Sequence, residues 1–114
     1  MAGTSLQKTF SALADPTRCA VVSLLGEKPL RSSEMADELS TSRPLMSRHL
    51  RVLREAGLVE EQASASDARV RVYRLRREPL HELRSWLEQV EAFWGDQLAA
   101  FKAHAERGDK KRSR

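Results

Sequence analysis

Apolar residues recur at helical spacing along most of the chain, and they alternate with polar residues in one short region. Spacings of three and four predict helices over residues 5–14, 16–25, 32–39, 43–56 and 78–106. Alternating patterns at 58–62 and 70–75 predict two strands joined by a polar tip. The pattern therefore predicts a mainly α fold of about five helices with one small β-hairpin.

Capping residues define the boundaries of these predicted helices. Asp15 and Ser42 each precede a helix with a proline in its first turn, where the missing N–H costs nothing. Ser32 is the expected cap of the short third helix, and Gly57 is the expected end of the fourth. Only residues 40–42 separate the third and fourth helices, which is the spacing of a helix-turn-helix.

The last predicted helix carries more apolar surface than a domain of this size can bury. One seam steps along it by threes and fours: Leu80, Leu83, Leu87, Val90, Trp94, Leu98 and Phe101. Trp86 and Phe93 widen the seam into a second stripe, which indicates contact with another chain. The alternative is a ligand pocket, but aromatic residues at helical spacing are more often interface core. Gly95 marks either a kink or a close backbone approach.

Length and composition describe one small domain of 114 residues, 40% hydrophobic and 32% charged. These values exclude a low-complexity or wholly disordered chain. We assign residues 1–106 to the domain and expect residues 107–114 to form a disordered basic tail. No apolar run reaches the length of a membrane span, and the first residues do not resemble a signal peptide, so the expected location is the cytoplasm.

Charge is divided unevenly along the chain, although the total is only +4. Residues 43–77 contain nine arginines and four carboxylates, a net charge of +5, whereas residues 78–106 carry a net charge of −4. A basic segment within an otherwise neutral domain indicates a polyanion as partner. The basic residues of the tail either add phosphate contacts or form a solubilising end.

The basic segment places its arginines on one face of the predicted fourth helix. Opposite the apolar stripe of that helix lie Pro44, Ser47, Arg48 and Arg51, and Arg43 lies at its N-terminus. Arginine pairs with guanine edges in the major groove, serine bonds to base or phosphate, and a helix N-terminus attracts phosphate. The predicted hairpin adds further arginines: Arg69, Arg71, Arg74 and Arg76. This combination predicts double-stranded DNA as the partner.

Two segments resemble the ArsR/SmtB family of winged-helix repressors. Residues 10–18 read FSALADPTR, and residues 42–59 read SRPLMSRHLRVLREAGLV, which is the more specific of the two. The resemblance extends over about residues 6–106. It implies a winged helix-turn-helix fold with a recognition helix at 43–56 and a β-wing at 58–75 that reaches toward the DNA backbone or minor groove.

The resemblance also implies a homodimer built on the first and last helices, which binds half-sites about 34 Å apart on an imperfect palindrome. The residues expected to contact DNA are Ser42, Arg43, Pro44, Ser47, Arg48, His49, Arg51, Arg69 and Arg71. Those expected in the dimer interface are Leu6, Phe10, Leu83, Leu87, Val90, Trp94, Leu98 and Phe101. For His49 two interpretations stay open, a DNA contact by family analogy and packing under the wing.

The chain departs from the metal-sensing members of that family. Their Cys-x-Cys pair has no counterpart on the third helix, and the last helix offers only Glu78, His81 and Glu82 near its start. We read the two glutamates as acids that complement the helix dipole, and we predict no metal site and no cofactor. Cys19 is expected to be a small hydrophobic residue beside the apolar stripe of the second helix, with redox sensing as the alternative.

No catalytic constellation stands out in the sequence. Ser47 and His49 are two residues apart on a helix and point to different sides, and the scattered glycines form no phosphate-cradling loop. The chain is therefore predicted to be a non-enzymatic, sequence-specific DNA-binding regulator, a homodimeric repressor that can regulate its own gene, with an unknown effector. Two alternatives remain, a protein-interaction module that docks through the last helix and a metal- or thiol-responsive sensor.

Overall fold

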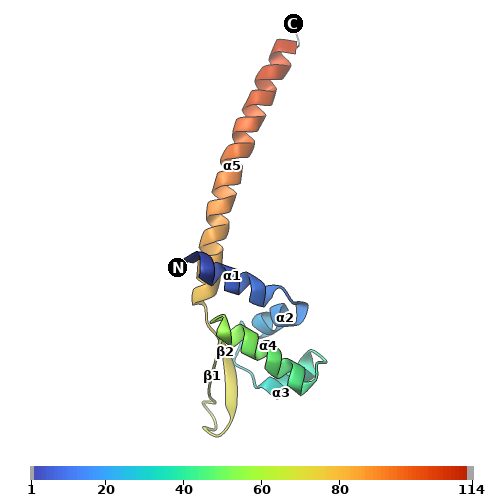
Figure 1. Cartoon of the computed structure of the whole chain (residues 1–114), viewed down its shortest axis with the longest axis vertical. Coiled ribbons are helices and arrows are strands. Elements are labelled where there is room, and N and C mark those ends of the chain that lie inside the picture. Colours follow the sequence, from blue (N-terminus) through green and yellow to red (C-terminus); the bar gives the residue numbers. More distant parts are fainter. Residues whose placement is uncertain (1, 113–114) are drawn as a thin grey trace. The chain divides into compact units, whose positions relative to one another are not determined.

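The structure, a computed structural model, describes residues 2–112, with side chains from residue 5 to residue 108. Its elements are, in chain order, α1 (Ala2–Leu13), α2 (Pro16–Leu25), α3 (Ser32–Glu38), α4 (Arg43–Glu55), β1 (Val59–Ala63), β2 (Arg71–Leu75) and α5 (Glu78–Arg112) (Figure 1). The described residues divide into two compact units, one up to Leu83 and one from Arg84 onward. The predicted fold, helices with a single hairpin, is confirmed.

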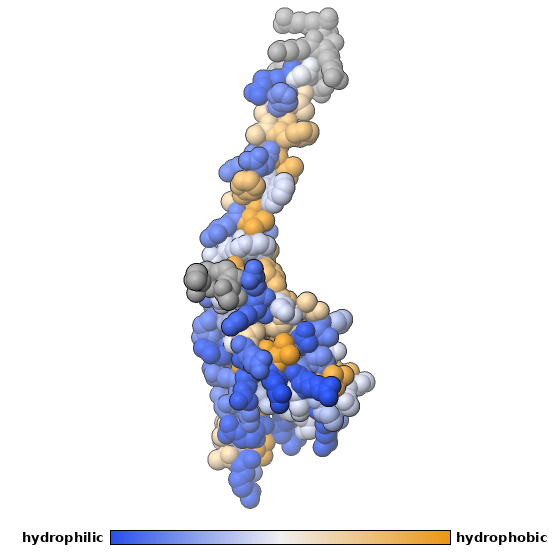
Figure 2. Space-filling view, in the orientation of Figure 1, coloured by the Kyte–Doolittle hydropathy of each residue, from blue (hydrophilic) through white to orange (hydrophobic). Residues whose placement is uncertain are grey.

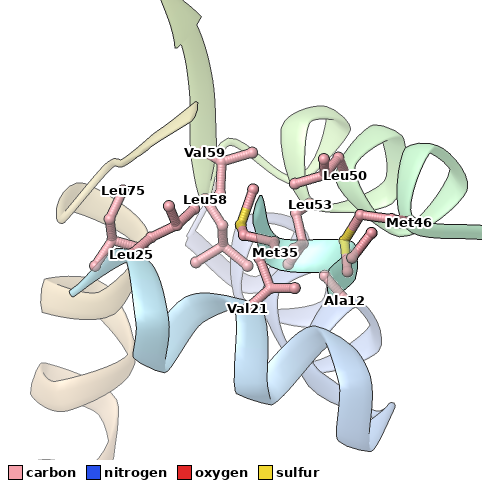
Figure 3. Packing of buried hydrophobic residues seen from close by; sticks show 11 residues of the cluster. Ala12, Val21, Leu25, Met35, Met46, Leu50, Leu53, Leu58, Val59 and Leu75 are labelled. Atoms are coloured by element: carbon pink, nitrogen blue, oxygen red, sulfur yellow. The ribbon is translucent and has the colours of Figure 1, made fainter. Parts of the chain in front are cut away.

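The core of the first unit joins the helices to the hairpin. Its buried hydrophobic residues are Ala12, Val21, Leu25, Met35, Ala36, Met46, Leu50, Leu53, Leu58, Val59 and Leu75. Figure 3 shows side chains of α2, α3 and α4 converging with Leu58 and Val59 at the start of the hairpin. Because burial of apolar surface is the dominant favourable term in folding, this cluster holds α4 and the base of the hairpin in one arrangement.

A side-chain cap closes the junction of α1 and α2. The carboxylate of Asp15 accepts hydrogen bonds from the backbone N–H groups of Thr17 and Arg18, at 2.8 and 3.1 Å. The hydrogen bond from Arg18 is the main reason why the pKa of Asp15 lies below its ordinary value, although desolvation acts against it. The predicted cap is confirmed.

The start of α3 differs from the prediction, because Ser32 is its first helical residue and Arg31 occupies the cap position. The backbone N–H of Arg31 donates to the carboxylate of Glu34 at 2.9 Å. This hydrogen bond, with a second one from the Arg31 side chain, lowers the pKa of Glu34. An acidic side chain in the first turn thus completes this N-terminus, and the expectation of a Ser32 cap is wrong by one residue.

The turn from α3 to α4 depends on one left-handed residue. Ser40 has a φ of +51°, a conformation that is uncommon for residues other than glycine. The following residue, Thr41, donates its backbone N–H to the carbonyl of Ala36 at 2.9 Å, which ends α3. This turn sets the direction in which α4 leaves the helix before it.

The hairpin β1–β2, which we call the wing, is antiparallel, and Val59 pairs with Leu75 at its base. The connector before α3 lies beside β2 and forms an isolated antiparallel β-bridge with it, since Leu30 and Tyr73 exchange backbone hydrogen bonds of 3.2 and 2.8 Å. At the tip, the N–H of Ser64 donates to the carbonyl of Val70 at 2.8 Å. The base of the wing is therefore fixed by the core and by the connector.

The last helix, α5, continues to Arg112 instead of ending near residue 106. Residues 107–112, which we assigned to the tail, belong to this helix, and residues 113–114 lie outside the described residues. Arginine and lysine are good helix formers. A Cβ atom on Gly95 would meet nothing within 4 Å in the described structure. None of the described helices has the length and apolar character of a membrane span.

Candidate nucleic-acid interface

Helix α4 is held at both ends and along one side. The hydroxyl of Ser42 accepts a hydrogen bond from the backbone N–H of Leu45 at 3.2 Å. Gly57 follows the helix with a φ of +76°, a conformation that favours glycine. The side chains on the inner face are fully buried: Met46, Leu50 and Leu53. The predicted cap, stripe and end of this helix are confirmed, and its opposite face is open to solvent.

The open face of α4 presents arginines that have no carboxylate partner. Arg43, Arg48 and Arg51 are exposed and form no side-chain ion pair within the described part of the chain. Pro44 and Ser47, also expected to contact DNA, are exposed on the same helix. Since guanidinium groups pair with guanine edges and with phosphate oxygens, this face has the chemistry to bind DNA.

His49 lies on the flank of α4 and is only 8% exposed. Its Nδ1 atom lies 3.3 Å from Nη1 of Arg18 in α2. Arginine can only donate, so Nδ1 accepts and the ring proton of a neutral imidazole lies on Nε2. The same guanidinium donates through Nε to the carbonyl of Ala12 at 2.6 Å. The structure therefore favours the packing interpretation of His49, with Arg18 rather than the wing as its contact.

The arginines of the wing, in contrast, are engaged by carboxylates. The ion pairs are Arg69 with Asp67 at 3.3 Å, Arg71 with Glu61 at 3.1 Å, and Arg74 with Glu60. Arg76 lies 3.9 Å from Glu60 and 3.6 Å from Glu78. Exposed pairs of this kind contribute only about 0–1 kcal/mol to stability, so their main consequence is a lower positive charge on the wing.

A hollow of about 460 Å³ lies between α4 and the wing. Its lining residues are Ser47, Leu50, Arg51, Arg54, Glu55 and Tyr73. Burial raises the pKa of Tyr73, and the carboxylate of Glu61 raises it further, so the phenol stays protonated at neutral pH and can donate a hydrogen bond. Hydroxyl and guanidinium groups are the usual side-chain donors to DNA phosphates.

Sequence reasoning missed Arg54, Tyr73 and Glu61, which meet at this hollow or at its edge. The Nη1 atom of Arg54 lies 3.1 Å from Oε2 of Glu61, and Glu61 pairs across the hairpin with Tyr73. A signal existed in the alternation of the strand, which places Glu60 and Glu61 on opposite faces. The hairpin register is also needed to bring these residues together, and the long polar tip does not specify it.

Cys19 is exposed, and its Sγ lies 2.9 Å from the carbonyl oxygen of Leu13. The expectation of a residue packed beside the apolar stripe is therefore wrong. The reason is helical geometry, because Cys19 lies two residues, roughly 200°, around α2 from the buried Val21. In the described structure, His, Cys, Asp and Glu side chains form no group of three that could hold a metal ion.

The residues expected in a dimer interface lie on α1 and α5. Of these expected interface residues, the most exposed are Leu87, Trp94, Leu98 and Phe101 of α5, from 45% to 70%. Leu83 and Val90 are half-buried, as is Leu6 in α1, and Phe10 is 41% exposed. Figure 2 shows hydrophobic residues running along α5 between hydrophilic ones. Because folded monomers rarely expose large contiguous apolar surface, this stripe is a candidate interface.

Comparison with known proteins gives one consistent result. A helix-turn-helix domain model matches residues 13–62. The HTH-type transcriptional regulator Rv2034 of Mycobacterium tuberculosis is 38% identical over 97 residues, which is 85% of each chain. The repressor SmtB of the same organism is 39% identical over 64 residues, 56% of this chain and 45% of the relative. An ArsR-like transcriptional regulator from Rhodococcus sp. RHA1 superposes with a TM-score of 0.74 at 33% identity, over 87% of this chain and 91% of that one.

Proposed function

Since the chain belongs to the ArsR/SmtB family of winged-helix transcriptional regulators, which bind DNA and are not enzymes, we propose that it is a homodimeric repressor acting in the cytoplasm. The repressor part of the proposal is supported by SmtB, which is named a transcriptional repressor. The proposed operator is an imperfect palindrome whose half-sites lie about 34 Å apart, because a two-fold symmetric dimer presents two copies of the same helix.

One observation carries the DNA-binding part of the proposal, namely the row of unpaired arginines on the open face of α4. We assign base or phosphate contacts to Arg43, Ser47, Arg48 and Arg51, with Ser42 and Pro44 beside them at the helix N-terminus. Arg69 and Arg71 are the proposed wing contacts, which DNA gains by displacing the carboxylates of Asp67 and Glu61 that pair with them. His49, packed on Arg18, contributes by fixing the flank of α4 rather than by touching a base.

The experiment that tests this function is a fluorescence-anisotropy titration of the protein against the DNA upstream of its own gene. Excess mixed-sequence competitor is present, and salt is varied between about 50 and 200 mM. Binding that survives the competitor is the expected result, and it would also indicate autoregulation. Loss of all binding to the competitor would contradict a sequence-specific site in that DNA, and the protein would then be tested on genomic fragments.

The dimer part of the proposal rests on the exposed stripe of α5. Trp94 is 57% exposed, and its ring packs edge to face on Phe93 with centroids 5.9 Å apart. The α5 residues proposed to contact a second copy are Leu83, Leu87, Val90, Trp94, Leu98 and Phe101. In α1, Leu6 and Phe10 are also proposed as dimer contacts. A helix-to-helix seam of this kind is typical of dimers that bury apolar residues at spacings of three and four.

Sedimentation velocity tests the dimer directly. We expect the wild-type protein to sediment as a dimer at micromolar concentration without any other component, and Trp94→Ala to shift it toward monomer. Asp96→Ala, a change on the opposite face of the same helix, is the matched control and leaves the dimer intact. A Trp94→Ala protein that stays fully dimeric would contradict this interface, and a monomeric wild type would favour a different protein as the partner of α5.

A further inference from the structure

The wing contains a carboxylate placed between two arginines that come from different elements. Oε2 of Glu61 lies 3.1 Å from Nη1 of Arg54, in the last turn of α4, and Oε1 lies 3.1 Å from Nε of Arg71, in β2. One carboxylate thus uses each of its oxygens for a separate guanidinium. Its side chain is 27% exposed, whereas those of Arg54 and Arg71 are 59% and 55% exposed.

Stability alone gives a weak reason for this arrangement. Exposed ion pairs contribute about 0–1 kcal/mol each, and the base of the wing is already fixed by Val59, Leu75 and the bridge from Leu30 to Tyr73. The effect on charge is larger, since Glu61 lowers the net charge of the cluster from +2 to +1 and repels a phosphate that approaches it. The cluster borders the hollow between α4 and the wing, because Arg54 lines that hollow.

We propose that Glu61 is a specificity-determining residue, which withholds Arg54 and Arg71 from the phosphates of random DNA. The inference rests on the proposed DNA-binding function. Sequence-independent binding depends on the number of phosphates that the protein neutralises, and each one contributes about 0.9 to the slope of log affinity against log salt. Specificity is the difference between the two binding free energies. Base contacts hold an operator in one register on α4, whereas random DNA can shift to place its phosphates on freed arginines, so holding these two arginines back weakens random binding more.

The adjacent residue Glu60 supplies a matched control on the same strand. Successive side chains of a strand point to opposite faces, and Glu60 pairs with Arg74 and approaches Arg76 instead of Arg54. Glu60→Gln and Glu61→Gln therefore make the same change in net charge. Only Glu61→Gln releases an arginine of α4 at the edge of the hollow.

The test is the affinity of wild type, Glu61→Gln and Glu60→Gln for a short mixed-sequence duplex between about 50 and 200 mM salt. We expect Glu61→Gln to bind at least about fivefold more tightly than Glu60→Gln at 0.1 M salt, with a slope steeper by about 0.9 or more, as one added phosphate contact requires. The ratio of operator affinity to random-DNA affinity should be lower for Glu61→Gln than for the wild type. Adding Arg54→Ala to Glu61→Gln removes part of the gain, because the two residues act through one contact.

Three results would overturn the proposal. Equal gains in affinity in both glutamine variants would show a general charge effect. Weaker binding by Glu61→Gln would show that the ion pairs of Glu61 hold the wing in position for DNA. An unchanged dependence of affinity on salt would show that Glu61 only stabilises the structure. Glu61→Thr and Glu60→Thr, neutral residues with good strand propensity, give a second pair with the same expectations if glutamine disturbs folding, which circular dichroism monitors. Failure of the wild type to bind any duplex at low salt would contradict the proposed function instead.

Discussion

Helix α4 and the wing both carry arginines, but within the described residues three arginines of α4 are unpaired whereas those of the wing form ion pairs. On α4, Arg43, Arg48 and Arg51 form no ion pair with a carboxylate in the described structure. On the wing, Arg69 and Arg71 each lie within 3.3 Å of a carboxylate. A phosphate that approaches α4 meets unpaired cations, whereas one that approaches the wing must compete with an acid that is already in place.

This difference shows why counting charges along a segment misjudges a binding surface. Residues 43–77 have a net charge of +5, but the acids of that segment are concentrated on the hairpin. Because Glu60, Glu61 and Asp67 form ion pairs with Arg74, Arg71 and Arg69 of the hairpin, the free positive charge is concentrated on α4. We expect α4 to supply most of the binding free energy, and the wing to adjust it.

The largest effect is expected from a change beneath α4, because its open face depends on its buried face. Leu53→Ala removes a fully buried side chain from the core and should lower the free energy of unfolding by about 2–5 kcal/mol. Urea unfolding followed by circular dichroism measures this loss. Val52→Ala, at an exposed position of the same helix, is the control and should change stability little. A loss below about 1 kcal/mol for Leu53→Ala would mean that α4 is not fixed by this core.

Next in size is the loss of one unpaired arginine. Arg48→Ala should cost about 1–3 kcal/mol of binding free energy on DNA that survives competition, and much less on random DNA, if Arg48 reads a base. Anisotropy titrations on both duplexes at the same salt concentration give the two numbers. Equal losses on both duplexes would reassign Arg48 to a phosphate contact. They would also weaken the distinction between α4, which contacts bases, and the wing, which adjusts affinity.

Local signals in the sequence predicted the helices and the face of α4 well. The caps Asp15 and Ser42, the buried stripe of α4 and its end at Gly57 each depend on a few neighbouring residues, which the sequence shows directly. The cap at Ser32 was wrong for a local reason too, since Glu34 satisfies the preceding backbone N–H and shifts the boundary by one residue.

Contacts between distant residues could not be predicted in the same way. His49 and Arg18 meet because α2 crosses α4, and Glu61 meets Arg54 because the wing returns beside that helix. Neither contact has a fixed spacing in sequence. The exposure of Cys19 also follows from which side of α2 faces the core. The candidate site was thus predictable where one helix forms it, and unpredictable where two elements meet.

A smaller effect is expected from a paired arginine. Arg71→Ala should cost less than about 1 kcal/mol on random DNA, because Glu61 already offsets the charge that is removed. Arg51→Ala, an unpaired arginine of α4, is the comparison under identical conditions and should cost more. A loss from Arg71→Ala equal to that from Arg51→Ala would show that phosphates displace Glu61 without cost, and the difference between the two regions would vanish on DNA.

The smallest expected effect concerns the tip of the wing, where Asp67 holds Arg69. The backbone N–H of Arg69 donates to Oδ1 of Asp67 at 3.0 Å, and this hydrogen bond is the main cause of a pKa below the ordinary value of 3.8. A carboxyl group with a lowered pKa in the folded state favours folding above its unfolded value, and this contribution fades as the pH falls through the folded value. The amide resonance of Arg69 should therefore titrate with a midpoint below 3.8.

The matched variant Asp67→Asn keeps an acceptor for the backbone N–H but has no carboxyl group to titrate, so its Arg69 resonance should stay flat over the same range. Its side chain also leaves Arg69 without an anionic partner, so random DNA should be bound slightly more tightly at pH 7. A wild-type midpoint at or above 3.8 would show that neither the backbone hydrogen bond nor the ion pair to Arg69 persists in solution. Arg69 would then belong with the unpaired arginines of α4, and the contrast between the two regions would be confined to the cluster around Glu61.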